Sequence, residues 1–284
     1  MAALPPASAW RALLERALEE DLGPGDVTSA SLVAAERRGR ARIEARAALV
    51  ACGLPVAAAT FRALDPEAAF TARCAEGDRL RPGDLLAEVE GRLVDLLAAE
   101  RTALNFLYRL CGIATLTRRF VDAVAGTGVR VLDTRKTVPG WRVLDKYAVA
   151  VGGGANHRSG LYDGILVKDN HVAVAGGVGA ALKAIRAAAP AHLRIQVEVE
   201  SESQAEEAIA AGADLLLLDN RSVEELQRFA ARFRDRVQLE ASGGITLANV
   251  RAVAESGVQR ISVGALTHSV PGADVSLEIT GSDA

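Results

Sequence analysis

Six short apolar runs in the second half of the chain decide its fold. They read VRVLD (129–133), YDGILVKD (162–169), RIQVEVE (194–200), ADLLLLDN (213–220), VQLEASGG (237–244) and RISVGAL (260–266). Stretches with the spacing of amphipathic helices separate several of these runs, at 179–189, 203–211, 222–233 and 247–256. Near-continuous valine, isoleucine and leucine runs that alternate with helices are typical of parallel strands buried on both faces. The pattern predicts an α/β fold built around a barrel-like layer of six parallel strands.

The first 110 residues follow a different pattern. Residues 8–20 have helical spacing, and the turn-rich GPGD sequence at 23–26 follows them. Strands are expected at 40–52 and 68–75, and EGDRLRPGDLLAEVEG (76–91) has the turns of an antiparallel sheet. From Leu93 to Thr117 the spacing becomes helical again. The chain therefore divides into two regions, of which the second carries the parallel strands.

Polar residues follow each of the six apolar runs. In an α/β barrel the reactive groups gather at the carboxyl ends of the strands, where the loops converge. Six polar endings in succession therefore predict an active site around one mouth. The endings are Asp133-Thr134-Arg135-Lys136, Lys168-Asp169-Asn170-His171, Glu198 to Glu200, Asp219-Asn220, Ser242-Gly243-Gly244 and Gly264.

Strand alternation predicts which of these side chains face the barrel interior. Gln196, Glu198 and Glu200 share one face of a strand, whereas the intervening valines share the other face. We expect the valines to pack against the helices and the polar side chains to face inward. Asp219 lies on the inward face of the next strand. An inward carboxylate must be paired or must bind a metal, because an isolated buried charge is costly.

The expected mouth has a cationic half and an acidic half. Arginine grips carboxylate or phosphate through two hydrogen bonds, so the cations favour a small substrate with several negative charges. Only four of the 33 basic residues are lysines, which makes the two lysines at the mouth conspicuous. Carboxylates together with substrate phosphates are the ligands that Mg²⁺ prefers. The glycines of SGG (242–244) and SVGA (262–265) allow backbone N–H groups to approach a phosphate, although ordinary tight turns have the same composition. The cations are Arg135, Lys136, His157, Arg158 and Lys168, and the acids are Glu198 and Asp219.

Composition excludes several other classes of protein. The net charge of −3 supplies no positive field for nucleic acid. The chain has no apolar run long enough to span a membrane, and its N-terminus lacks the apolar core of a signal peptide, so we expect a cytoplasmic location. Cys52, Cys74 and Cys111 are spaced neither as a zinc site nor as a disulfide framework, so we expect buried free thiols.

Two segments that contain several glycines match cofactor-binding motifs in part. GGVGAALKA (176–184) precedes a helix but has Leu182 where a dinucleotide fingerprint needs a third small residue. The turns of residues 76–91 are similar to a lipoyl or biotinyl hammerhead, but no lysine is present there to carry the cofactor. Neither segment predicts a bound cofactor.

Long segments of the chain resemble the quinolinate phosphoribosyltransferases. The resemblance extends from EDLGPGDVTS (20–29) to DVSLEI (274–279), with Cys111 at a position where the family more often has serine. The segments that carry it are ERTALNFLYRLCGIAT (100–115), DTRKTVPGWRVLDKYAVAVGGGANHRSGLYDGILVKDNH (133–171), VEVE (197–200), DLLLLDN (214–220), LEASGGI (239–245) and ISVGALTHS (261–269).

The resemblance implies a fold, an activity and an assembly. The fold is an N-terminal α/β sandwich domain over 1–112, joined by the C-terminal strand of 268–284, and an open α/β barrel over 113–267. The activity converts quinolinate and phosphoribosyl pyrophosphate to nicotinate mononucleotide, pyrophosphate and carbon dioxide, in NAD biosynthesis. The assembly is a homodimer in which Arg101 reaches the barrel mouth of the neighbouring subunit.

The resemblance also implies roles for individual residues. Lys136, Lys168, Glu198 and Asp219 are implied to be catalytic, and Thr134 to contact substrate. The quinolinate carboxylates are implied to meet Arg101, Arg135, His157, Arg158 and Lys168. Lys136 is implied to lie near the pyrophosphate, and Glu198 and Asp219 to hold Mg²⁺ and the ribose hydroxyls. The 5′-phosphate is implied to meet Ser242, Gly243, Gly244, Gly264 and Ala265. For Asn170 and His171 we prefer hydrogen bonds that shape the loop.

Three alternatives remain open from the residues. A related phosphoribosyltransferase could act on another pyridine, although five candidate cations favour a dicarboxylate. Lys168 could form a Schiff base in an aldolase, although Arg135 and Arg158 suit anions better. The chain could also be a metabolite sensor without activity, although Glu198 and Asp219 favour metal chemistry.

Overall fold

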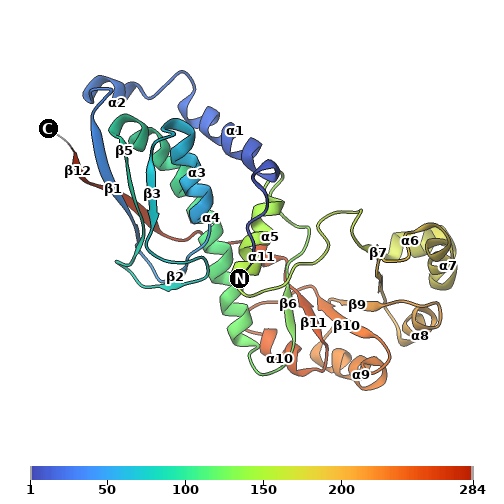
Figure 1. Ribbon diagram of the computed structural model, residues 1–284. Helices are drawn as coiled ribbons and strands as arrows, with labels where there is room; N and C mark the ends of the chain where they lie inside the picture. The colour runs from blue at the N-terminus through green and yellow to red at the C-terminus, as the bar shows by residue number, and fades with distance from the viewer. Residues whose placement is uncertain (1, 283–284) are drawn as a thin grey trace. The chain divides into compact units, whose positions relative to one another are not determined.

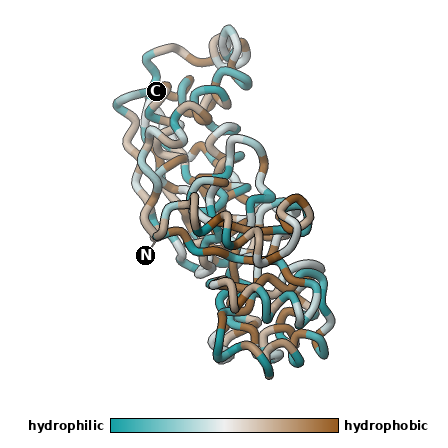
Figure 2. The backbone as a smooth tube through the Cα atoms, turned by 90° about the vertical axis from the view of Figure 1, so that its right-hand side faces the viewer, coloured by the Kyte–Doolittle hydropathy of each residue, from teal (hydrophilic) through white to brown (hydrophobic). Residues whose placement is uncertain are grey.

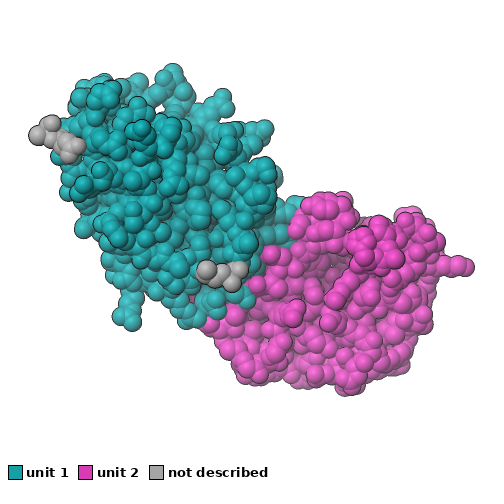
Figure 3. Space-filling model, in the orientation of Figure 1, with its two compact units in different colours: residues 1–118, 137–153, 269–284 teal, residues 119–136, 154–268 magenta. Residues whose placement is uncertain are grey.

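The computed structural model describes residues 2–282, which form two compact units. Unit 1 comprises residues 1–118, 137–153 and 269–284, and unit 2 comprises residues 119–136 and 154–268 (Figure 3). The domain boundary near residue 112 remains a prediction. Within the described residues, no helix has the length and apolar content that crossing a membrane requires.

Unit 1 is built on an antiparallel sheet with the strand order β12-β1-β5-β3 (Figure 1). The expected strand at 40–52 is two strands, because the chain turns at 46–48 between them. The strands are β1 (Arg38–Ala45), β2 (Leu49–Val50), β3 (Ala69–Ala72), β4 (Arg79–Leu80), β5 (Leu85–Arg92) and β12 (Val275–Ser282). The helices are η1 (Ala7–Ala9), α1 (Arg11–Leu22), α2 (Val27–Leu32), α3 (Leu54–Leu64), α4 (Leu93–Ala123) and α5 (Arg142–Val151).

The helices of unit 1 are fixed by buried polar contacts as well as by apolar packing. Glu76 accepts hydrogen bonds from the backbone N–H groups of Gly53 and Leu54 at the start of α3, and from the Tyr147 hydroxyl at 2.7 Å. Arg109 of α4 holds the fully buried Asp145 of α5 through two hydrogen bonds of 2.8 and 2.7 Å. A buried carboxylate is stable only when it is paired in this way.

Unit 2 contains the six parallel strands that the sequence predicts, in the order β6-β11-β10-β9-β8-β7 (Figure 1). In the hydropathy-coloured trace of Figure 2, apolar segments alternate with polar ones. The strands are β6 (Arg130–Leu132), β7 (Ile165–Val167), β8 (Ile195–Glu198), β9 (Leu215–Asp219), β10 (Gln238–Ser242) and β11 (Arg260–Ser262). The helices are α6 (Asp169–Ala175), α7 (Val178–Ala188), α8 (Glu202–Ala210), α9 (Val223–Phe233), α10 (Val250–Glu255) and α11 (Ala265–His268).

The register of the parallel strands decides which side chains face the interior. Glu198 pairs with Leu217 on β9, and Leu217 pairs with Glu240 on β10, so these three side chains share one face of the sheet. Val197 and Leu216 lie on the opposite face and are fully buried. The alternation in the sequence therefore predicts the two faces correctly as far as Glu198.

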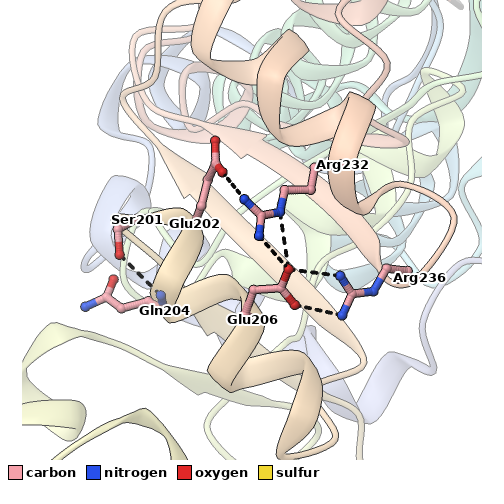
Figure 4. A network of polar contacts seen from close by, with 6 residues as sticks. All are labelled: Ser201, Glu202, Gln204, Glu206, Arg232 and Arg236. Atoms are coloured by element: carbon pink, nitrogen blue, oxygen red, sulfur yellow. Dashed lines mark hydrogen bonds and ion pairs between the residues drawn. The ribbon is translucent and has the colours of Figure 1, made fainter.

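An exposed network of ion pairs joins α8 to α9 on the outside of unit 2 (Figure 4). Glu206 accepts hydrogen bonds from Arg232 at 2.9 Å and from Arg236 at 2.8 Å, and Glu202 pairs with Arg232 at 2.5 Å. Such surface pairs contribute little individually to stability, because water screens the exposed charges. The network lies away from the strand ends, so we assign it to packing of the outer helices.

The three cysteines are free thiols, as expected. Cys52 and Cys111 are buried, whereas Cys74 is half-buried. Burial raises the pKa of Cys111 to about 12 and that of Cys74 to about 11. A high pKa leaves little thiolate at neutral pH, so these cysteines are packing residues rather than nucleophiles.

Candidate active site

A cavity of about 420 Å³ opens at the carboxyl ends of the parallel strands of unit 2. The six polar strand endings therefore converge, apart from Glu198 and Glu200, which line a neighbouring depression. The side chains and backbone that line the cavity are Thr134, Arg135, Lys136, His157, Arg158, Leu166, Lys168, Leu217, Asp219, Glu240, Ser242, Gly243, Gly244, Ile245, Thr246, Ser262, Gly264, Ala265 and His268.

One wall of the cavity is cationic. Arg135 and Lys136 follow β6, Arg158 lies in the loop before β7, and Lys168 follows β7. Burial, together with the charge of Arg135, lowers the pKa of Arg158. Two guanidinium groups that repel each other in a shared cavity are stabilised when an anion binds between them. This wall therefore suits a carboxylate-bearing ligand.

The loop that presents Arg158 is anchored to the end of β6. The fully buried Asp133 accepts hydrogen bonds from the His157 backbone N–H at 2.8 Å and from Asn156 Nδ2 at 2.6 Å. Arg158 Nη1 in turn donates to the Gly164 carbonyl at 3.0 Å. These contacts hold the cation-bearing loop at the mouth of the barrel.

The acidic half of the site is divided between two hollows. Asp219 lines the main cavity, whereas Glu198 lines the neighbouring depression of about 190 Å³. Lys168 connects them, because its Nζ lies 3.4 Å from Glu198 Oε2 and its side chain also lines the main cavity. The expectation for Glu200 is wrong: β8 ends at Glu198, and Glu200 is exposed.

Glu198 and Asp219 fit a Mg²⁺ ion that also binds substrate phosphates. They share one face of adjacent strands. The buried Oε2 of Glu198 forms no hydrogen bond with any described residue. Within residues 2–282, no cluster of three or more histidine, cysteine, aspartate or glutamate side chains forms a metal site. Mg²⁺ commonly takes only one or two protein carboxylates and completes its shell with water and phosphate, so two carboxylates suffice.

Glycine-rich loops form another part of the cavity lining. Gly243 and Gly244 follow β10 with φ values of +81° and +63°, which favour glycine, and Gly264 and Ala265 follow β11. Thr267 Oγ1 donates to the Lys136 carbonyl at 2.7 Å and ties the segment after β11 to the loop after β6. Backbone N–H groups at such turns form concavities that bind phosphate.

The structure also places the remaining residues that the sequence singled out. Arg101 lies on α4 in unit 1 with its side chain exposed. Thr134 lines the cavity, and its Oγ1 accepts a hydrogen bond from the Lys136 N–H at 3.0 Å. His171 Nδ1 accepts a hydrogen bond from the Lys168 N–H at 3.0 Å, so the expected hydrogen bond is present, but it caps the start of α6 rather than shaping a loop.

Sequence reasoning missed two titratable residues that line the cavity, Glu240 and His268. Glu240 is fully buried on β10, and its Oε2 accepts a hydrogen bond from Arg260 Nε at 2.8 Å. The signal for Glu240 was its place two residues before Ser242, on the same face of the strand. His268 ends the short α11, and no periodicity in the sequence distinguishes it.

Comparisons with known proteins agree with one another. Models of the N-terminal and C-terminal domains of quinolinate phosphoribosyl transferase match residues 26–111 and 113–278. The chain is 44% identical over 278 residues to the carboxylating nicotinate-nucleotide pyrophosphorylase of Mycobacterium leprae, covering 95% of this chain and 97% of that protein. It is 43% identical over 268 residues to a probable enzyme of the same name from Bacillus subtilis, covering 94% and 92%. The crystal structure of NadC from Streptococcus pyogenes superimposes with a TM-score of 0.93 at 38% identity, covering 98% of this chain and 99% of that chain.

Proposed function

The chain belongs to the quinolinate phosphoribosyltransferase family and catalyses its reaction, and we propose that the residues at the mouth of its barrel divide that reaction as follows. The reaction joins quinolinate to phosphoribosyl pyrophosphate and yields nicotinate mononucleotide, pyrophosphate and carbon dioxide, a step of de novo NAD biosynthesis. The observation that carries the assignment is a single cavity lined both by two neighbouring guanidinium groups and by glycine-rich loops. Turnover with quinolinate, compared with nicotinate and nicotinamide, tests it.

The cationic wall binds the two carboxylates of quinolinate. Arg135 and Arg158 supply planar groups that match a carboxylate in pairs, and Lys168 supplies a compact charge beside them. His157 belongs to the same wall and holds the loop in place. Three cations for one acceptor favour the dicarboxylate over nicotinate, which has a single carboxylate.

The glycine-rich end binds the 5′-phosphate of phosphoribosyl pyrophosphate. Ser242, Gly243, Gly244, Gly264 and Ala265 surround this end, and their backbone can approach the phosphate closely. Lys136 lies beside this end, because its Cδ is 3.3 Å from a Cβ built on Gly264, so Lys136 is placed to stabilise the pyrophosphate as it leaves.

Glu198 and Asp219 hold Mg²⁺ and the ribose hydroxyls. When bound, Mg²⁺ supplies positive charge that offsets the charge of the pyrophosphate. Asp219 faces the main cavity directly, and Glu198 reaches the site beside Lys168. The Oε2 of Glu198 accepts no hydrogen bond from a described residue and has only the ion pair with Lys168, which supports its use as a ligand.

The order of bond changes follows from charge. The quinolinate nitrogen, oriented by its clamped carboxylates, attacks the anomeric carbon of the ribose, and the bond to pyrophosphate breaks. Positioning of this kind supplies much of the rate. The alkylated ring nitrogen is cationic, so the bond to the 2-carboxylate breaks with its electron pair kept by the ring carbon. Carbon dioxide leaves and a proton replaces it. The substrate is therefore its own electron sink.

We further propose a homodimer in which Arg101 enters the barrel mouth of the partner subunit. Arg101 is an exposed cation on α4, so it is available to a second copy, and the family resemblance gives it this role. The cytoplasmic location also remains a proposal, which the three free cysteines support.

Mixing two inactive variants tests the shared site. Arg101→Ala and Lys168→Ala chains should each be inactive alone and should regain activity when mixed, because a heterodimer contains one site with both cations. Because one of the two sites in each heterodimer is intact, each heterodimer should have up to about half of the activity of the unaltered dimer. The measurement is carbon dioxide release after subunit exchange, verified with a tag on one chain. Exchange without recovery would contradict a site shared between subunits.

A further inference from the structure

A layer of polar side chains is buried in the barrel below the cavity. Glu240 on β10 is fully buried, Gln196 on β8 is 4% exposed, and Arg260 on β11 reaches Glu240 Oε2 at 2.8 Å. His157 meets this layer from the loop before β7, with its Nε2 3.0 Å from Gln196 Oε1 and 3.4 Å from Glu240 Oε1. The layer therefore joins three strands to the loop that carries the cationic wall.

Both ring nitrogens of His157 are used inside the protein. Its Nδ1 accepts a hydrogen bond from the backbone N–H of Arg158 at 2.8 Å, so this nitrogen carries a lone pair rather than a proton. The neutral ring must then carry its proton on Nε2, which donates to Gln196 Oε1. This tautomer follows from the hydrogen-bond network. A ring with both nitrogens engaged has no nitrogen to offer to a substrate carboxylate.

Glu240 is charged although it is fully buried. Contacts with His157 and Arg260 lower its pKa and outweigh the opposing effect of burial. A buried carboxylate without such partners is costly, so the pair with Arg260 fixes an anion at this depth of the barrel. That anion favours a proton on the facing Nε2 of His157, and therefore a lone pair on Nδ1.

We propose that His157 is a positioning residue that acts on quinolinate through Arg158. Glu240 and Gln196 hold the ring, the ring holds the Arg158 backbone, and the Arg158 guanidinium meets the substrate. The inference rests on the proposed function for its substrate. It differs from the expectation that His157 touches the quinolinate carboxylates itself.

A double-mutant cycle tests the coupling of His157 to Arg158. His157→Gln keeps an amide that can reach Gln196 and Glu240 but lacks the acceptor at the Nδ1 position. We expect kcat/KM for quinolinate to fall about tenfold through KM, with KM for phosphoribosyl pyrophosphate unchanged. In an Arg158→Ala background the same change should cost less than about twofold, because the group that His157 positions is already absent. Equal losses in both backgrounds would show that His157 contacts substrate by itself and would overturn the proposal.

Two further variants complete the cycle. His192→Gln is the matched control, because His192 is an exposed histidine of the same unit, and its kinetics should equal those of the unaltered chain. Glu240→Gln by itself would leave the Arg260 guanidinium without a carboxylate partner. The double variant with Glu240→Gln and Arg260→Met is therefore compared with the unaltered chain. This pair should raise KM for quinolinate severalfold, and the increase should vanish when Arg158 is alanine. An increase in KM that persists in the Arg158→Ala background would show that Glu240 acts independently of Arg158, and would contradict the proposal.

The tautomer has a readout that needs no turnover. The chain contains four histidines, so ¹⁵N spectra of the imidazole rings can be assigned by comparison with His157→Gln. A protonated Nε2 and an unprotonated Nδ1 on His157 are expected, and a protonated Nδ1 would overturn the proposal. Failure of the unaltered chain to use quinolinate would instead overturn the proposed function, so the two failures are distinguishable.

Discussion

Gly243→Ala is expected to lower kcat/KM for phosphoribosyl pyrophosphate by at least a hundredfold. Gly243 has φ +81°, and a Cβ built on it lies 2.2 Å from Asn220 Oδ1 and 2.9 Å from the Asn220 backbone nitrogen. Asn220 is itself held in the left-handed region, with φ +52°, and its N–H donates to the Ser242 carbonyl at 2.8 Å. The loop that carries Asn220 and the loop that carries Gly243 therefore cannot both keep their positions. The part of the cavity that is proposed to bind phosphate must shift.

Gly126→Ala is the matched control for this change. Gly126 has the same φ of +81°, lies in unit 2 away from the cavity, and has no atom within 4 Å of its added Cβ. It should show only the cost of a left-handed alanine, about 1–2 kcal/mol of stability, with normal kinetics. Steady-state rates over a range of phosphoribosyl pyrophosphate, with thermal unfolding of both variants, provide the comparison. Near-normal kinetics in Gly243→Ala would place the phosphate elsewhere.

Lys168→Ala is expected to lower kcat/KM for quinolinate by about a hundredfold. Truncating one partner of a buried charge contact costs about 2–5 kcal/mol, roughly thirtyfold to several thousandfold, and the lower part of that range is expected because the Lys168 side chain is 51% exposed without substrate. Lys168 lines the main cavity and also pairs with Glu198, so its loss affects both the acceptor wall and the acidic pair.

The control for this second change is Lys183→Ala. Lys183 is an exposed lysine on α7 that lines no part of the cavity, so normal kinetics are expected. Quinolinate saturation curves at fixed phosphoribosyl pyrophosphate measure both variants. Unchanged turnover in Lys168→Ala would remove this lysine from the acceptor wall.

The barrel could be predicted from the sequence because its signal is repeated. Each of the six apolar runs ends in polar residues, and parallel strands bring those ends to one edge. Alternation correctly predicted the buried Val197 and the inward Glu198. It was wrong for Glu200, because alternation holds only while the strand continues, and β8 stops at Glu198.

Other features of the site lack a local signal. Glu240 shares a strand face with Ser242, but its role is recognised only when its partners His157 and Arg260 are known, and both are distant in sequence. Arg101 has the periodicity of an ordinary exposed helical residue, so only the family resemblance gave it a role. The sequence pattern predicts no helix at α6 (Asp169–Ala175), because the polar residues that begin this helix also follow directly after a strand.

The central claim is that one mouth holds a dicarboxylate pyridine opposite a phosphorylated ribose and its metal. The most direct measurement follows carbon dioxide and pyrophosphate together, using the purified chain with phosphoribosyl pyrophosphate and each of quinolinate, nicotinate and nicotinamide, with and without Mg²⁺. Equal amounts of both products from quinolinate alone, and only with Mg²⁺, are predicted. Pyrophosphate release with nicotinate at a comparable rate, or turnover of quinolinate unaffected by removal of the metal, would contradict the account.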